Sequence, residues 1–105
     1  MERETVRQIL QIPFIPFVDF AIMMANLTPD ERMAVELREH RKLCIPEAAE
    51  AAHLSETQHK EHYRHGMNKL AACWDGQPWI RAVLNEYLRA RCKMQFSDPS
   101  RKFVH

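Results

Sequence analysis

The chain has 105 residues, of which 46% are hydrophobic and 28% charged, and only two are glycine. This length is enough to bury one core without metals or disulfides, and the apolar fraction argues against a disordered or fibrous protein. Hairpin-rich sandwiches and barrels need many turn residues with positive φ, which two glycines do not supply. We therefore expect an all-α, compact helical domain of five to six helices that spans residues 1–105.

Cysteine usage and hydropathy indicate the compartment. Cys44, Cys73 and Cys92 are widely spaced and form no C-x-x-C pattern, which is typical of reduced cytosolic thiols. The most apolar run, Ile12–Ala25, is interrupted by two prolines and an aspartate and is too short to cross a hydrocarbon core about 30 Å thick. The first ten residues lack the pattern of a secretion signal. We expect a cytoplasmic protein with no membrane segment.

Charge is distributed unevenly although the net charge is only +1. Residues 1–26 and 27–73 each carry −1, whereas 77–105 carry +4, and Asp75 supplies the remaining negative charge. Five of the six histidines lie within 27–73. A polyanion is therefore expected to meet the C-terminal part of the chain first.

The first clear helix signal is a capping box at Thr28–Glu31, where proline also occupies the first helical position. It predicts a helix that starts at Thr28. Apolar residues continue on one face through Met33, Ala34 and Leu37. The helical pattern is lost in the charged run Arg38–Lys42.

Two further helices are predicted in the middle of the chain. A short one covers Pro46–Ala52, with proline in its first turn and an acidic residue placed well for the helix dipole. A second capping box, Ser55–Gln58, starts a longer helix that runs to about Cys73. One face of this helix carries residues at spacings of four, four and three, namely His59, Tyr63, Met67 and Leu70.

The flanks are expected to be helical as well. Residues 1–26 form an N-terminal flank with helix candidates at 2–11 and 17–26, separated by prolines. Asp75–Pro78 is a turn, and an amphipathic C-terminal helix follows at 77–94, ending near Lys93. Regular structure is predicted to end at Ser97–Ser100, inside a basic tail at 95–105.

The short helix, the turn of roughly three residues at His53–Ser55 and the longer helix together have the order of a helix-turn-helix, which defines a core at 27–73. The residues that carry a resemblance to a known family, with no insertion or deletion between them, are Leu27-Thr28-Pro29-Asp30-Glu31-Arg32, Leu43, Glu47-Ala48-Ala49-Glu50, Leu54-Ser55-Glu56, Lys60 and Lys69-Leu70. Over Leu27–Leu70 the chain resembles region 4 of bacterial sigma-70 factors and related helix-turn-helix regulators.

The resemblance implies roles for the matching positions. Ala49 is the small residue where the two helices cross, and Leu54 and Met67 belong to the core. The outward N-terminal part of the longer helix, Ser55–Leu70, would lie in the major groove of double-stranded DNA. Glutamine can pair with adenine, glutamate can accept from cytosine, and lysine or arginine can hold phosphate or guanine. The candidate DNA-binding residues are Ser55, Glu56, Thr57, Gln58, Lys60, Glu61 and Arg64.

The central core looks underfilled from the sequence. Ala48, Ala52 and His59 are smaller or more polar than the branched residues usual at such positions, and Gly66 costs about 1 kcal/mol of helix stability relative to alanine. His53 replaces a common turn glycine, and histidine tolerates positive φ better than most residues. The aromatic residues of the flanks are expected to cover the core: Phe14, Phe17, Phe20, Trp74, Trp79 and Tyr87.

Catalytic and metal sites are not expected. The chain has no glycine-rich phosphate loop, H-E-x-x-H or G-x-S-x-G motif. His59, His62 and His65 follow at steps of three, which spreads them over about 240° of the helix and does not converge on a metal. We interpret His59 as a core residue and the other two as surface groups. No cofactor is expected.

The leading hypothesis is therefore a DNA-binding transcriptional regulator, with double-stranded DNA as its partner and RNA polymerase or another transcription factor as a further partner. Homodimerisation is left open, because a lone motif offers few base contacts. The alternative hypothesis is a protein-interaction module of the same fold that binds RNA polymerase, a sigma factor or another regulator with little direct DNA contact. A plain bundle helix with a solvated face also accounts for Ser55–Cys73.

Overall fold

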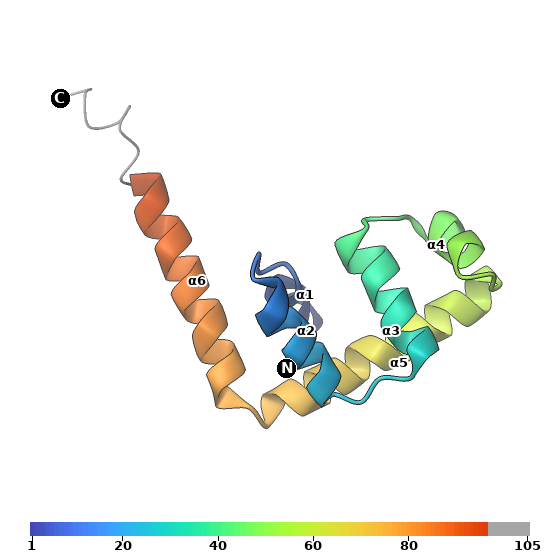
Figure 1. The fold of residues 1–105 in the computed structure, drawn as a ribbon, viewed down its shortest axis with the longest axis horizontal. Helices are drawn as coiled ribbons and strands as arrows, with labels where there is room; N and C mark the ends of the chain where they lie inside the picture. The colour runs from blue at the N-terminus through green and yellow to red at the C-terminus, as the bar shows by residue number, and fades with distance from the viewer. Residues whose placement is uncertain (97–105) are drawn as a thin grey trace.

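The computed structural model describes residues 1–96, with side chains described to Cys92. Within that range the chain forms six α-helices and one π-helical turn and contains no strand, which confirms the all-α expectation (Figure 1). The predicted end of regular structure at Ser97–Ser100 and most of the basic tail lie outside the described residues. The elements are α1 (Arg3–Leu10), α2 (Ile15–Met24), α3 (Pro29–Val35), the π-helical turn η1 (Glu36–His40), α4 (Ile45–Ala51), α5 (Glu56–Asp75) and α6 (Pro78–Phe96).

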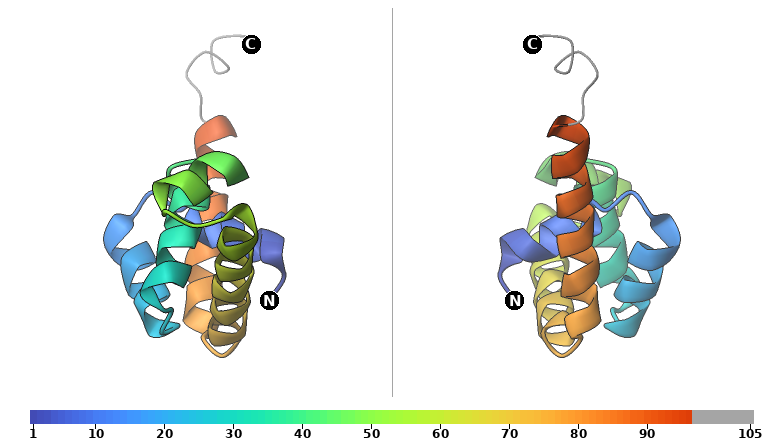
Figure 2. Two further views of the ribbon diagram at one scale, coloured as in Figure 1. Left: turned by 90° about the vertical axis from the view of Figure 1, so that its right-hand side faces the viewer. Right: turned by 90° about the vertical axis from the view of Figure 1, so that its left-hand side faces the viewer.

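Helix α5 is the central element, because α1, α2, α3, α4 and α6 all contact it. Figure 1 shows α4 beside the first turns of α5, whereas α6 leaves from the opposite end of α5 and projects away from it. Viewed along the long axis, α2 and the start of α1 lie on opposite flanks of the molecule (Figure 2). The N-terminal turns of α5 are thus separated from α6 by the body of the domain.

Both predicted capping boxes are present. The Thr28 hydroxyl accepts from the Glu31 amide at 3.2 Å, and the Glu31 carboxylate accepts from the Thr28 amide at 2.9 Å. In the second box, the reciprocal bonds between Ser55 and Gln58 are both 3.1 Å. Each side chain satisfies an amide that has no partner within the helix, which fixes where α3 and α5 begin.

Helix α4 begins one residue earlier than predicted. Cys44 occupies the N-cap position, and the Glu47 carboxylate accepts from the Cys44 amide at 3.2 Å. Cysteine is not a preferred N-cap residue, so the sequence pattern alone favoured a start at the proline. At the other end of the motif, α5 continues two residues past Cys73 to Asp75.

The charged segment that follows α3 is still helical at its start. Glu36–His40 continue as a π-helical turn, in which the Arg41 amide donates to the Glu36 carbonyl at 3.0 Å. Lys42 then takes a left-handed conformation with φ of 59° and ends the segment. Glu39 is only 3% exposed. A single π turn inside an α-helix shifts the register of the residues after it, which α-helical periodicity does not anticipate.

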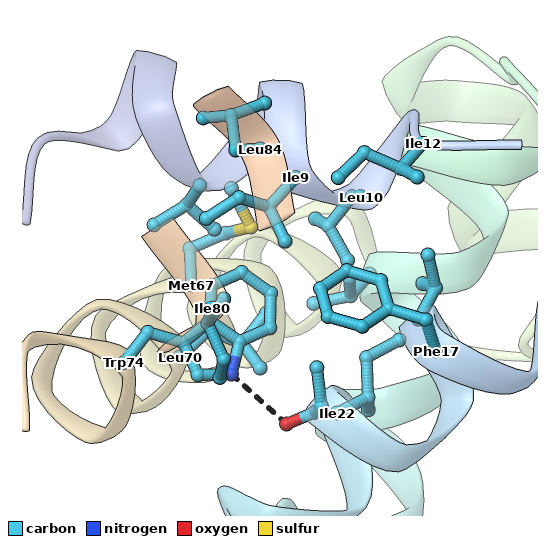
Figure 3. Close-up of a cluster of buried hydrophobic side chains, with 14 of the residues drawn as sticks. Ile9, Leu10, Ile12, Phe17, Ile22, Met67, Leu70, Trp74, Ile80 and Leu84 are labelled. Atoms are coloured by element: carbon cyan, nitrogen blue, oxygen red, sulfur yellow. Dashed lines mark hydrogen bonds between the residues drawn. The ribbon is translucent and has the colours of Figure 1, made fainter. Parts of the chain in front are cut away.

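The core is aliphatic at its centre (Figure 3). The Trp74 indole is buried in this cluster and donates to the Ala21 carbonyl at 2.9 Å, tying α5 to α2 (Figure 3). The fully buried branched aliphatic residues come from α1, α2, α3, α5 and α6 and include Val6, Ile9, Leu10, Ile22, Val35, Leu70 and Ile80. Ala48 and Ala49 of α4 are buried as well, but they are not part of this cluster.

The aromatic residues cover the core only in part. Phe17 and Trp74 are buried and Tyr87 is half-buried, as expected. The prediction is wrong for Phe14, Phe20 and Trp79, which are 60%, 49% and 40% exposed. Trp79 still contacts the core edge, where its ring packs edge-on against Phe17.

Gly66 permits a close approach of α5 to α3. A Cβ atom at this position would lie 2.9 Å from Val35 Cγ2 and 3.2 Å from the Glu31 carbonyl oxygen. The sequence indicated only the helix-propensity cost of this glycine, whereas the structure shows that the two helices touch where it has no side chain. Ala49 and Met67 are buried, and Leu54 is half-buried.

Candidate nucleic-acid interface

The turn between α4 and α5 is tight and well bonded. The Leu54 amide donates to the Ala49 carbonyl at 2.9 Å, and His53 adopts a left-handed conformation with φ of 58°. Histidine tolerates this region better than branched residues do, so the turn forms without glycine. Helix α4 contacts α5 beside this turn, and the two helices are thereby held as a helix-turn-helix.

The candidate DNA-binding residues lie together on one exposed surface. Ser55 caps α5, and the other candidates, Glu56, Thr57, Gln58, Lys60, Glu61 and Arg64, occupy its first turns. All of them are exposed. Glu56, Lys60 and Arg64 follow at steps of four and so share one side of the helix. The structure therefore places all the predicted residues on the exposed first turns of α5, and these three on one side of the helix.

Several of these side chains already have partners. The Gln58 carbonyl oxygen accepts from the Ser55 amide in the capping box, which leaves only its NH₂ group available. Bidentate pairing with adenine needs both groups, so Gln58 would have to release the cap to make it. Arg64 donates to Glu61 at 2.8 Å. Lys60 makes no side-chain bond within the described part of the chain, and it is the cation that is free to meet a phosphate.

The inward face of α5 carries His59, which is fully buried. Neither Nδ1 nor Nε2 of this ring has a hydrogen-bond partner. Burial, the charge of Arg38 and then His62 lower the pKa of His59, so the ring is held neutral. His62 is half-buried and His65 is exposed. The interpretation of His59 as a core residue is confirmed.

Sequence reasoning missed a buried network around Glu39. Its carboxylate accepts from the Tyr63 hydroxyl at 2.6 Å and from Arg7 Nε at 3.1 Å, and its carbonyl accepts from Gln11 at 2.8 Å. Burial and the hydrogen bond to Glu39 raise the pKa of Tyr63 to about 12. The same carboxylate raises the pKa of Arg7. No local pattern signals this network, because it joins α1, η1 and α5.

Two further arginines flank the Tyr63 ring. The guanidinium carbon of Arg38 lies 4.5 Å from the ring centroid, and that of Arg3 lies 5.7 Å from it. Guanidinium groups at such distances are attracted by the negative face of the ring. The result is a concentration of positive charge between α1 and the segment that precedes α4.

Metal and membrane sites were also sought among the described residues. No group of three or more His, Cys, Asp and Glu side chains in residues 1–92 is placed to hold a metal ion. None of the helices within residues 1–96 combines the length and the apolar character that crossing a bilayer requires.

No protein-family model, curated protein or solved structure matches this chain.

Proposed function

We propose that this chain is a DNA-binding transcriptional regulator in which the first turns of α5 enter the major groove of double-stranded DNA. The observation that carries the proposal is the exposed polar face from Ser55 to Arg64, backed by α4 and the tight turn. A major groove about 12 Å wide admits one α-helix. Lys60 would hold a phosphate, and Arg64 would exchange Glu61 for a base or phosphate.

The net charge of −1 counted for residues 27–73 understates how well this segment could approach DNA. Within 27–73, Glu31 and Glu39 are buried, and each accepts a bond from a cation. Burial would raise the pKa of Glu31, but bonds from Lys69 and Thr28 outweigh it and hold the pKa below its ordinary value. Since Lys69 belongs to 27–73 and Arg7 does not, only the Glu39 carboxylate is compensated from outside this segment, and a DNA backbone would meet a charge closer to zero than −1.

The direct test is a salt titration of binding to mixed-sequence duplex DNA, repeated at about pH 6 and pH 8. The expected result is an affinity that falls linearly with the logarithm of salt concentration. Lys60→Ala should weaken binding to all sequences and lower the salt slope by about one. Gln58→Ala should change site preference. Arg81→Ala removes an exposed cation from the basic C-terminal segment, and its loss of affinity should be smaller than that of Lys60→Ala, because α6 leaves from the opposite end of α5. Absence of binding at low salt would contradict the proposal.

The alternative is a protein-interaction module that binds RNA polymerase, a sigma factor or another regulator. It is favoured by apolar side chains left exposed on α2 and at the start of α6: Phe20 is 49%, Met23 60% and Trp79 40% exposed. The ring centroids of Phe20 and Trp79 lie 6.1 Å apart. Contiguous exposed apolar groups often mark a protein contact.

Two substitutions separate the candidates. If the interaction function is correct, Met23→Ser should weaken binding to purified RNA polymerase, and Lys60→Ala should leave that binding unchanged. If the DNA-binding function is correct, Lys60→Ala should lose DNA affinity while Met23→Ser retains it. The side chains of Met23 and Lys60 are both exposed in the folded chain, so each variant should keep the native helical circular dichroism.

A further inference from the structure

A hollow of about 590 Å³ lies between α1, η1 and the start of α4, on the face of the molecule that carries the Tyr63 network. Four cationic side chains line it, two from α1 and two from the segment after α3: Arg3, Arg7, Arg38 and Lys42. These pairs are far apart in the sequence and meet only in the folded chain. The hollow lies beside α4 and is not part of the exposed face from Ser55 to Arg64.

The positive charge of the hollow is compensated only at Arg7. The single acidic residue in its lining is Glu39, and Arg7 and Tyr63 already occupy that carboxylate. Among the described side chains, neither Arg3 nor Arg38 has a carboxylate within 4.0 Å. Guanidinium groups bind phosphate through paired, charge-assisted hydrogen bonds. The hollow thus presents donors for an anion with more than one negative charge.

The cations are also held in place before any ligand arrives. Arg38 and Arg3 both lie beside the ring of Tyr63, and that ring is fixed by its bond to Glu39. Lys42 donates to the side chain of Gln11 at 2.5 Å. Groups that are already ordered lose less conformational entropy on binding. The arrangement is therefore more than a set of independent surface charges.

One wall of the hollow is apolar. Leu43 and Ile45 line it and are half-buried. Its volume falls within the range of about 300 to 1,000 Å³ that is typical of small-ligand sites. A concave recess with one cationic and one apolar wall suits a small molecule that has a phosphate chain and a planar or apolar part.

We propose that this hollow binds a small organic polyphosphate of the nucleoside di- or triphosphate class. The phosphates would contact Arg3, Arg38 and Lys42, and the base would lie against Leu43 and Ile45. A rod-like duplex presents its phosphates on a convex surface and fits such a recess less well. The proposal does not depend on the DNA-binding function, because none of these residues belongs to the exposed face of α5.

The test is isothermal titration calorimetry of the full chain with inorganic triphosphate and with ATP. Binding should weaken as salt rises, and ATP should bind more tightly than triphosphate because of the apolar wall. Arg3→Gln and Arg38→Gln should each raise the Kd for ATP by about tenfold, since each removes one charge-assisted contact. Arg41→Gln removes a cation next to η1 that does not line the hollow, and its Kd should stay within about twofold of the unmodified chain.

Several results would overturn the proposal. They are no binding of either probe at low salt, equal affinity for both probes, or the same loss in Arg41→Gln as in Arg3→Gln. A loss of duplex DNA binding in Arg3→Gln, with no competition by ATP, would also overturn it, because the cations would then serve the DNA backbone. If Arg38→Gln fails to fold, Arg3→Gln decides alone, since Arg3 is exposed in the first turn of α1.

Discussion

The Tyr63 hydroxyl donates a 2.6 Å hydrogen bond to Glu39, and this bond joins the central helix α5 to the π-helical turn η1. Glu39 is 3% exposed and Tyr63 is 8% exposed, so water cannot easily replace either partner. A buried carboxylate that loses a donor keeps its full desolvation cost. The phenol of Tyr63 therefore contributes to the stability of η1, together with the bonds from Arg7 and Gln11.

Tyr63→Phe should lower the free energy of unfolding by about 1–3 kcal/mol, because it leaves Glu39 with one fewer donor in a buried site. Urea denaturation followed by circular dichroism measures this change. Tyr87→Phe is the matched control, since Tyr87 is half-buried and its hydroxyl makes no hydrogen bond within the described residues. Equal stability of Tyr63→Phe and Tyr87→Phe would contradict the prediction.

The same bond predicts an alkaline titration. In Tyr87→Phe the remaining phenol, Tyr63, should ionise at about pH 12 instead of 10.0, and tyrosinate absorbance reports it. Because the folded pKa is raised, the stabilisation is fully present below pH 10 and is lost as pH rises towards 12. Ionisation near pH 10 in a chain with native circular dichroism would be inconsistent with the buried bond.

His59 predicts an acid-sensitive fold. Its folded pKa lies below the ordinary value of 6.5, so the unfolded chain takes up the proton first. Stability should be complete above pH 6.5 and should fall as pH drops from there towards the folded pKa.

His59→Leu should raise the free energy of unfolding by about 1–3 kcal/mol and reduce its fall below pH 6.5, because it removes two buried unpaired polar atoms. Denaturant midpoints between about pH 5 and pH 8 measure both effects. His65→Leu changes an exposed histidine on the same helix and should preserve the acid dependence. An unchanged pH profile in His59→Leu would count against this interpretation.

The two glycines should respond in opposite ways to alanine. Gly66→Ala places a methyl group 2.9 Å from Val35 Cγ2 and 3.2 Å from the Glu31 carbonyl oxygen, so we expect destabilisation of about 1–3 kcal/mol despite better helix propensity. Gly76→Ala meets only the Cys73 carbonyl oxygen at 3.6 Å and should be neutral or stabilising by up to about 1 kcal/mol. Thermal unfolding of both variants measures the contrast. A stable Gly66→Ala would show that α3 and α5 can separate at no cost.

Local signals made much of the fold predictable. The boxes at Thr28 and Ser55 are complete within four residues, so their pattern is enough to locate the starts of α3 and α5. The start of α4 was harder to predict, because its cap depends on the Glu47 carboxylate accepting a hydrogen bond from the amide of a cysteine. The split of the aromatic residues into buried and exposed ones depends on which helices fill the core, and no local pattern contains that information.

The candidate sites were also predictable from the sequence only in part. The exposed face of α5 follows from helical periodicity, and its binding to DNA stays a prediction. The basic hollow could not be found from sequence, because Arg3 and Arg38 belong to elements that meet only through tertiary packing. The burial of Glu39 could not be predicted for another reason. This residue lies in a charged run, and such runs are usually solvated. Only its contacts with Arg7 and Tyr63 in the folded chain make it a buried residue.

The π-helical turn makes the length of the chain between α3 and α4 as important as its composition. Each residue of an α-helix advances the helix by about 100°, so deleting one residue within Glu36–His40 would let the segment close as ordinary α-helix and rotate everything after it. Arg41 and Lys42 would then lie about 100° away from their present positions around the helix axis. A chain with one residue fewer in this turn should therefore lack the basic hollow, even where every arginine is retained.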